Sequence, residues 1–404
     1  MCLSVRQIYL YPRTARFSSP TGMGAAVSLH SHSECSRETL EFLPRIARSI
    51  PVLAYRYERA LEQYQRENGR PLDLGEWYYR PPVTPAEVID SERAQIERRL
   101  DLPGWVSLTD HDTVDGPLGL RAHGRTDVPI SFEWSVPFEQ SLFHLGVHGI
   151  APSAIDATMQ ALAAYTNGPR IDESRRLAEL LDQLGECPET FVVLNHPCWD
   201  LVRIGQLRHD SALLAFLRAH GDRIHALELN GYRPWAENRC VLPLATGFGI
   251  PVAGGGDRHA LSPNAIVNLT RASSLAEFAH ELRVERFSCC VVFPEYAEPF
   301  AARVFQSTAD ILRPLPEHQR GQKTWSQRVF INVNGHEQAL ASMWEGEPLW
   351  LRGALAVTRA IGSKPFASLF ELMRADGHQT LEADCQLEPL VDVAPRLTSD
   401  SVAA

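Results

Sequence analysis

Short apolar runs recur along this chain, separated by stretches with helical spacing, and several runs end directly before His, Asp, Glu or Asn. Runs of this kind, bounded by polar or turn residues, are typical of buried strands. Their alternation with helical stretches favours parallel strands joined by crossover helices, and therefore an α/β fold. The runs cover residues 25–29, 105–108, 129–132, 143–146, 191–194, 226–229, 250–253 and 288–293.

The length and the charge of the chain limit its class. Its 404 residues suffice for one large α/β barrel or for two ordinary domains. The 39 Lys and Arg residues against 49 Asp and Glu residues give a net charge of −10 with neutral His, so no overall positive field attracts nucleic acid or an anionic membrane. We therefore expect neither a stable nucleic-acid complex nor a membrane partner, while a local basic site stays open. The oligomeric state does not follow from the sequence.

The cysteine pattern and the N-terminus favour a cytoplasmic protein. The 8 Cys residues form no C-x-x-C pair and no regular framework, which disfavours a zinc ribbon and a disulfide scaffold. No apolar run approaches the roughly 20 residues that span a bilayer, and the N-terminus has no continuous apolar stretch. Arg6, Arg13 and Arg16 precede the first acidic residue, a pattern that a transit peptide would share. We expect residues 1–24 to form a loose leader.

A change in the pattern of apolar runs and turn residues after about residue 320 predicts a main domain and a smaller C-terminal segment. The main domain covers residues 25–320, with an insertion over about 50–104 whose helix at 55–66 forms a wall or a lid. Thr84 and Glu87 have the spacing of a helix capping box. From about residue 321 to 390 we expect a small β-rich segment with a tail to residue 404, because strand-like runs lie at 328–333 and 349–357 and turns at 334–335 and 375–377.

Two motifs at expected strand ends carry imidazole and carboxylate groups. His30 and His32 follow the first apolar run, so both imidazoles lie on one side of a strand end and form a workable metal chelate. Asp110 and His111 follow the second run, where a carboxylate can orient a ligand ring. Each motif alone is also compatible with solvated loop histidines or a plain acidic turn.

The third and fourth runs carry two more candidates. Glu133 directly follows run 129–132, where a carboxylate is costly to bury unless it is paired or bound to metal. His144 lies within run 143–146 and is, by itself, also compatible with a satisfied core histidine. His148 is a rival ligand that we rank lower.

Two further motifs complete the pattern. Asn195 and His196 follow another run, and Asp257, Arg258 and His259 follow three glycines that permit tight backbone turns. Five strand ends that carry His, Asp or Glu, in a chain of successive β/α units, fit a barrel mouth with one polynuclear metal site.

Taken in order, these motifs resemble those of the polymerase and histidinol phosphatase (PHP) superfamily of metal-dependent phosphoesterases, over roughly residues 25–295. The chain is most similar to the stand-alone hydrolases of that superfamily, because it is too short to carry a polymerase. The resemblance implies a distorted (β/α)7 barrel with two or three divalent ions, Zn, Mn or Fe, at the C-terminal strand ends. It implies that His30, His32 and Asp257 hold one ion, that Glu133 bridges it to a second ion completed by His144 and His196, and that His111 and His259 hold a third.

Two departures from the superfamily pattern concern the third ion and the substrate. In relatives a further ligand often follows the H-x-H motif as Asp or His; here the candidates are Glu38, which we include among the ligands, and Glu34 as the alternative. Asn195 replaces a residue that is often small. The insertion over about 50–104 is longer than usual, so the substrate of relatives is not carried over.

The expected reaction is hydrolysis of a small phosphomonoester, a nucleotide or a short oligonucleotide by a metal-activated water. Arg258 is the expected phosphate contact, with Arg233 as a weaker candidate, and Asp110 is expected to orient the site. A metal-dependent amidohydrolase that cleaves a C–N bond is an alternative, disfavoured because Lys323 and Lys364 are the only lysines and lie outside the motifs. A non-catalytic metal-binding PHP-like protein is another, disfavoured by the nearly complete ligand set.

Overall fold

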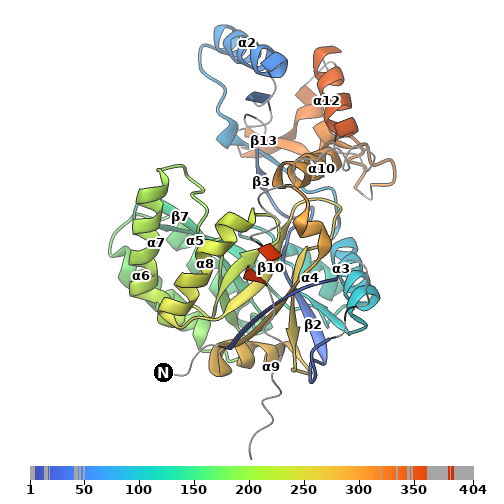
Figure 1. The fold of residues 1–404 in the computed structure, drawn as a ribbon. Coiled ribbons are helices and arrows are strands. Elements are labelled where there is room, and N and C mark those ends of the chain that lie inside the picture. The colour runs from blue at the N-terminus through green and yellow to red at the C-terminus, as the bar shows by residue number, and fades with distance from the viewer. Residues whose placement is uncertain are drawn as a thin grey trace, which may run out of the picture.

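The computed structural model describes residues 5–12, 17, 19–40, 44, 47–48, 51–318, 320–333, 335–343, 346, 349–361, 381–382 and 384–385. Figure 1 shows a large α/β body and, above it, a smaller group of elements that includes α2 (Pro51–Asn68) and α12 (Leu349–Ile361). The motif-bearing strands all lie in the large body.

Within the described residues, a 10-stranded sheet runs in the order β1-β12-β11-β2-β10-β9-β8-β7-β6, with β5 beside β2. The neighbouring pairs β2–β10, β10–β9 and β9–β8 are parallel. Strand β7 is antiparallel to its neighbours β6 and β8, and β11 is antiparallel to its neighbours β12 and β2. The predicted α/β class is confirmed, but the sheet is mixed rather than uniformly parallel. Its strands are β1 (Val5–Leu10), β2 (Ala25–Ser31), β5 (Gly104–Val106), β6 (Phe132–Phe138), β7 (Ser141–His148), β8 (Phe191–Asn195), β9 (Ala226–Asn230), β10 (Val252–Arg258), β11 (Ile266–Thr270) and β12 (Phe287–Val292).

The expected strand at 129–132 is displaced. The observed strand β6 begins at Phe132 and pairs with β7 in a hairpin, in which Phe138 opposes Ser141. The buried side chains of Phe132, Trp134, Val136 and Phe138 stand at every second position of β6 and so point to the same face of the strand. The turn residue Glu139 has a φ of 52°, which a tight hairpin turn requires.

One bridge brings together segments that are distant in the sheet order. His111, after β5, pairs in parallel with Glu133 at the start of β6. The backbone bonds are Glu133 N–H to Asp110 O at 3.2 Å and Asp112 N–H to Glu133 O at 2.8 Å. The described pairings establish a mixed sheet with this bridge, and the closed barrel that the resemblance implies stays a prediction.

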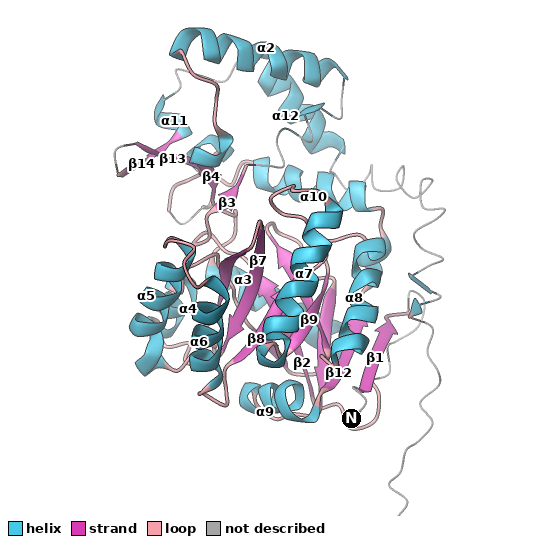
Figure 2. Ribbon diagram, turned by 90° about the vertical axis from the view of Figure 1, so that its left-hand side faces the viewer, coloured by secondary structure: helices cyan, strands magenta, loops and turns pink. Residues whose placement is uncertain are grey.

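Helices cover the large sheet, and Figure 2 shows α7 and α8 lying across one of its faces. The predicted capping box is confirmed at the start of α3, where the Glu87 N–H donates to Thr84 Oγ1 at 3.2 Å and the Thr84 N–H donates to the Glu87 carboxylate at 2.8 Å. The main core packs Trp134 and Leu145 of the sheet with Leu181 and Phe216 of the helices. These helices are α3 (Pro85–Leu100), α4 (Asp115–Ala122), α5 (Ile155–Thr166), α6 (Glu173–Gly185), α7 (Gln206–His220), α8 (Trp235–Phe248), α9 (Leu275–His280) and α10 (Phe300–Leu312).

A second sheet joins the insertion to the C-terminal segment. Its strands run in the order β14-β13-β4-β3 and all pairs are antiparallel. The sheet therefore contains residues from both predicted segments, and the helix expected near 55–66 is present as α2. The strands are β3 (Glu38–Thr39), β4 (Trp77–Tyr79), β13 (Val329–Val333) and β14 (His336–Ala339), followed by the short helix α11 (Leu340–Met343).

Two expectations for the chain ends need correction. The strand at 328–333 is confirmed, but the strand expected at 349–357 is wrong, because this stretch forms helix α12, with Leu355 and Thr358 buried at helical spacing. The turns expected at 334–335 and 375–377 involve positions outside the described residues. At the other end, part of the expected loose leader forms strand β1, which pairs with β12. Among the described residues, no helix is long and apolar enough to cross a bilayer.

Candidate metal centre

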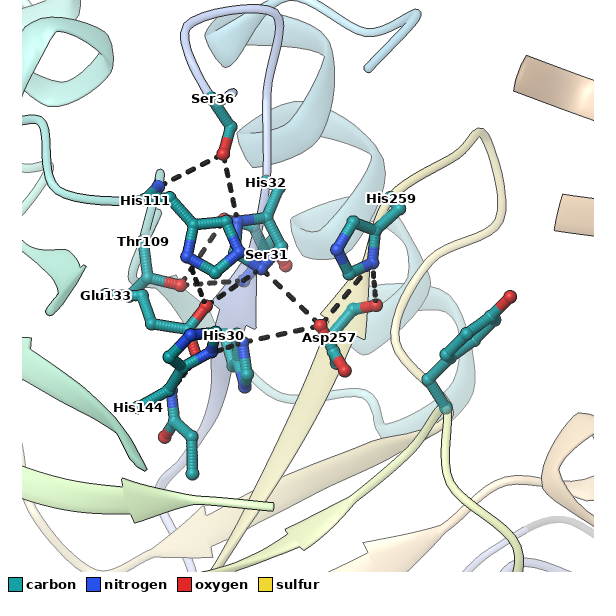
Figure 3. A network of polar contacts seen from close by, with 12 residues as sticks. His30, Ser31, His32, Ser36, Thr109, His111, Glu133, His144, Asp257 and His259 are labelled. Carbon is teal, nitrogen blue, oxygen red and sulfur yellow. Dashed lines mark hydrogen bonds and ion pairs between the residues drawn. The ribbon is translucent and has the colours of Figure 1, made fainter. Parts of the chain in front are cut away.

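The structure brings all the predicted metal ligands, from the large sheet and from β3 of the small one, into one place, which we call the candidate metal centre. Figure 3 shows several of their side chains converging on Glu133 and Asp257 from different strands. Four overlapping groups have ligand atoms within 4.8 Å of one another. The groups are His32 with Glu38, His111 and His259; His30 with His32 and Glu133; His30 with His196 and Asp257; and His111 with Glu133 and His144.

The two carboxylate oxygens of Glu133 face different imidazoles. Oε1 lies 3.2 Å from His30 Nε2 and 3.2 Å from His144 Nδ1. Oε2 lies 3.4 Å from His32 Nε2 and 3.2 Å from His111 Nδ1. Two ligands that are each about 2.0–2.2 Å from a tetrahedral ion lie about 3.3–3.6 Å apart, so these separations match shared ions. A carboxylate that has imidazoles beside each of its two oxygens is suited to bridge two ions.

Asp257 and Glu38 extend the centre in the same way. Asp257 Oδ1 lies 3.5 Å from the Nε2 atoms of both His30 and His32. Glu38 Oε2 lies 2.9 Å from His259 Nε2 and 3.4 Å from His111 Nε2. Glu38 reaches the centre from β3 of the small sheet, so that sheet completes the candidate third site.

Several buried atoms of the centre have no hydrogen-bond partner. Among the described residues, His30 Nε2, His32 Nε2, Glu133 Oε2 and His144 Nδ1 are all in this state. Buried polar atoms are nearly always paired, because leaving one unpaired costs about 1–3 kcal/mol. Bound cations would satisfy these atoms, so the residues present fit a multinuclear metal site.

Three residues of the centre also adopt strained backbone conformations. His30, His196 and Asp257 have φ values of 63°, 27° and 52°, in the region that side chains with a Cβ rarely adopt. Each such residue costs on the order of 1–3 kcal/mol and persists where the surrounding structure holds it. The strain turns these side chains toward the common centre.

The carboxylates of the centre are held ionised. Burial alone would raise the pKa of Glu133, but the imidazoles of His30, His144 and His111 keep that pKa well below the usual range. Burial would also raise the pKa of Asp257, but the imidazoles of His259 and His30 hold that pKa well below the usual range. Ionised carboxylates are the form that binds cations.

Glu228 is a functional residue that the sequence analysis missed. Its Oε1 lies 2.6 Å from His30 Nδ1, and its Oε2 accepts the His196 backbone N–H at 2.7 Å. A carboxylate that bonds one imidazole nitrogen fixes the ring and leaves the other nitrogen for the metal. The available signal was a Glu inside the apolar run at 226–229, where a carboxylate is costly to bury unpaired, as it is at Glu133 directly after run 129–132.

Two other side chains support the carboxylates. Asn195, noted in the sequence as a departure from the superfamily, donates from Nδ2 to Glu133 Oε1 at 2.9 Å. Ser36 donates from Oγ to Glu38 Oε1 at 2.5 Å. Each bond holds one oxygen of its carboxylate in place beside the imidazoles.

Asp110 belongs to none of the four groups. Its two oxygens accept from Ser33, from the backbone N–H at 2.6 Å and from Oγ at 2.9 Å. Burial raises the pKa of Asp110 to about 7, against these two hydrogen bonds. Asp110 therefore links the loop after His32 to the end of the next strand. The orienting role expected of Asp110 would act on the position of this loop.

The structure also separates the rival candidates. His148 bonds Ser107 Oγ at 2.7 Å and stacks on Phe191, away from the four groups. Glu34 lies 3.0 Å from Arg320 Nε and outside those groups, so the geometry favours Glu38 over Glu34.

The expected phosphate contact of Arg258 does not fit the structure. Its guanidinium is buried and pairs with Glu92 at 3.0 Å. The remaining nitrogens donate to the carbonyl oxygens of Ala260 and Leu261 at 2.9 and 2.7 Å. The side chain is used inside the protein because a buried guanidinium needs partners for its donors, and the cavity lining does not include Arg258.

Arg258→Met is expected to destabilise the fold by about 3–5 kcal/mol, because it leaves the buried Glu92 carboxylate without its cation. Urea unfolding measures this loss. The matched variant Arg93→Met breaks an exposed pair with Asp127, and we expect it to change stability by less than about 1 kcal/mol. Equal effects of the two substitutions would contradict the structural role of Arg258.

A cavity of about 320 Å³ opens onto the centre. Its lining includes Glu38, His111, His144, His196, Asp257 and His259. Ligand sites of small molecules begin at about 300 Å³. The candidate metal centre is therefore accessible to a small substrate.

Comparisons with known proteins give only distant likenesses. No family model and no curated protein matches the chain. An amidohydrolase from Chromobacterium violaceum, solved with sulfate and without metal, is 18% identical with a TM-score of 0.32, over 58% of this chain and 88% of that one. A proposed metal-dependent phosphoesterase from Bifidobacterium adolescentis is 16% identical with a TM-score of 0.33, over 67% and 98% of the two chains. At these scores neither likeness decides what this chain does.

Proposed function

We propose that this chain is a metal-dependent hydrolase of the PHP superfamily that cleaves a small phosphomonoester, a nucleotide or a short oligonucleotide. The observation that carries this proposal is the arrangement of imidazoles around both oxygens of Glu133, with unpaired buried ligand atoms beside an open cavity. The proposal includes closure of the large sheet into a distorted (β/α)7 barrel around this centre.

The proposed ligand sets follow the motifs. Bound divalent ions, whether Zn, Mn or Fe, would polarise a phosphoryl oxygen and make hydroxide available near neutral pH. Glu228 keeps the His30 ring oriented through the contact at its Nδ1. The sets are His30, His32 and Asp257 for one ion, His144 and His196 with the bridging Glu133 for a second, and Glu38, His111 and His259 for a third.

Arg233 replaces Arg258 as the proposed phosphate contact. Three arginines line the cavity, and Arg37 and Arg203 are exposed whereas Arg233 is buried. The Nε and Nη2 atoms of Arg233 donate to Glu237 at 2.9 and 2.8 Å, and its guanidinium lies over the ring of Trp199, with Cζ 4.0 Å from the ring centroid. A guanidinium fixed on one edge presents its other edge to an anion at little entropic cost.

The alternative classes have less support. An amidohydrolase of the carbamylated-lysine type needs a lysine in the site, and no lysine is among the described residues that line the cavity. A purely structural metal site would be closed to solvent, whereas this centre borders a cavity.

Elemental analysis with an activity assay tests the proposal. We expect two or three ions per chain, loss of p-nitrophenyl phosphate hydrolysis on chelation, and recovery when Mn or Zn is restored. Protein without bound metal after both additions would contradict the metal centre. Metal-loaded protein that cleaves amides or lactams and no phosphoester would instead support the amidohydrolase class.

A further inference from the structure

The cavity has two chemically different sides. One side is the imidazole and carboxylate surface of the candidate metal centre. The other side consists mainly of aromatic and aliphatic side chains from the start of β7, from the segments after β8 and β9, and from α10. These side chains are Leu142, Trp199, Leu201, Val202, Tyr232, Phe300, Val304 and Ile311.

Helix α10 supplies one continuous part of this apolar wall. Phe300, Val304, Ser307, Thr308 and Ile311 all line the cavity. Their spacing of three or four residues places them on one face of the helix. Because α10 follows the last strand of the large sheet, this part of the wall is separate in sequence from the metal-type motifs.

Aromatic rings connect the metal centre with the wall. The ring centroid of Tyr232 lies 6.1 Å from that of His259 and 6.3 Å from that of Phe300. Trp199 contacts His196 edge to face, with centroids 5.0 Å apart. A group that extends from the centre toward α10 therefore meets ring faces and edges, which favour a flat apolar partner.

Of the eight side chains of the wall, Trp199 and Tyr232 alone carry a polar atom, and the polar side chains Arg37, Arg203, Arg233, Ser307 and Thr308 line the same cavity. Among the described residues that line the cavity, none is Asn, Gln or Lys. The Thr308 hydroxyl donates to the Val304 carbonyl at 2.7 Å, and Asp112 Oδ1 accepts the Ser135 backbone N–H at 2.9 Å. A sugar or polyol held against the eight side chains of the wall would leave hydroxyl groups unpaired, which is unfavourable.

We propose that the cavity selects phosphomonoesters in which the esterified group is a small aryl or arylalkyl group, bound against Phe300 and the apolar face of α10. This inference rests on the proposed function. The cavity of about 320 Å³ lies at the small end of ligand sites, which favours a single ring over an oligomer.

Inhibition by two non-hydrolysable phosphonates tests this selection. Metal-loaded protein is assayed with p-nitrophenyl phosphate in the presence of phenylphosphonate or methylphosphonate, and calorimetry measures the binding of each directly. We expect phenylphosphonate to bind about 10- to 100-fold more tightly, as burial of one apolar ring allows. Equal inhibition constants in an active enzyme would overturn the inference and leave the proposed function standing. No hydrolysis and no binding of either phosphonate would refute the proposed function itself.

Two phenylalanines of α10 provide a matched pair of variants. Phe300 lines the cavity, whereas Phe305 on the same helix does not. We expect Phe300→Ala to reduce the ratio between the two inhibition constants about 5- to 10-fold, and Phe305→Ala to leave that ratio unchanged. Val304→Ser is a milder second variant at the wall. If the ratio of the two inhibition constants fell in Phe305→Ala but stayed unchanged in both Phe300→Ala and Val304→Ser, α10 would not be part of the binding wall.

Discussion

Glu133→Gln is expected to lose bound metal and the proposed phosphoesterase activity together while the protein stays folded. Both oxygens of Glu133 face imidazoles at 3.2–3.4 Å. The substitution keeps the shape but removes the charge and turns one oxygen into a donor that cannot bind a cation. Loss of an outer partner alone lowers metal affinity about 10- to 100-fold, so we expect more than ~100-fold here.

The measurement combines elemental analysis, p-nitrophenyl phosphate hydrolysis and circular dichroism. Glu139→Gln is the matched control, because Glu139 is exposed at the turn of the same β6–β7 hairpin. We expect this control to keep metal and activity. A Glu133→Gln protein with the metal content and turnover of the wild type would remove Glu133 from the centre.

Gly255→Ala is expected to destabilise the protein by about 3 kcal/mol or more, because overpacking a buried site forces its neighbours to move. A Cβ at Gly255 would lie 1.8 Å from Glu228 Oε1. That oxygen contacts His30 Nδ1 at 2.6 Å, and the other oxygen holds the His196 backbone. The added methyl group therefore displaces Glu228, and we expect metal affinity to fall about 10- to 100-fold as well.

Urea unfolding and metal titration measure the two effects. Gly247→Ala in helix α8 is the control, since a Cβ there meets nothing within 4 Å, and alanine favours a helix by about 0.5–1 kcal/mol over glycine. If Gly255→Ala were as stable as the control and bound metal normally, the close contact with Glu228 would be refuted.

Much of the candidate centre could be predicted because its ligand-type residues occur in short local motifs. His30, His32, His196 and Asp257 each stand at or just beyond a strand of the large sheet, and strands that share a sheet bring such positions together. Unusual ligand-type residues after apolar runs are visible without knowledge of the packing. The class of fold followed from the same alternation of runs and helices.

Other features depended on partners that are distant in sequence. Arg258 has the residue type of a phosphate contact, but Glu92, which lies 166 residues away, holds its guanidinium inside the protein. Whether Glu34 or Glu38 reaches the centre was decided by the pairing of β3 with β4 in the small sheet. The apolar stretch that forms α12 has strand-like composition, and its helical packing became evident only with the buried positions of Leu355 and Thr358.

The sequence by itself determined which residues are able to bind metal and that they stand near strand ends, because side-chain chemistry and hydrophobic periodicity are local properties. The tertiary structure alone decided which carboxylate orients His30, which buried arginine borders the cavity, and which apolar face lies opposite the metal centre. Those outcomes depend on contacts across the large sheet, α8 and α10, and on the need of each buried charge for a partner. The local sequence pattern does not show which distant residue becomes the partner of a buried charge.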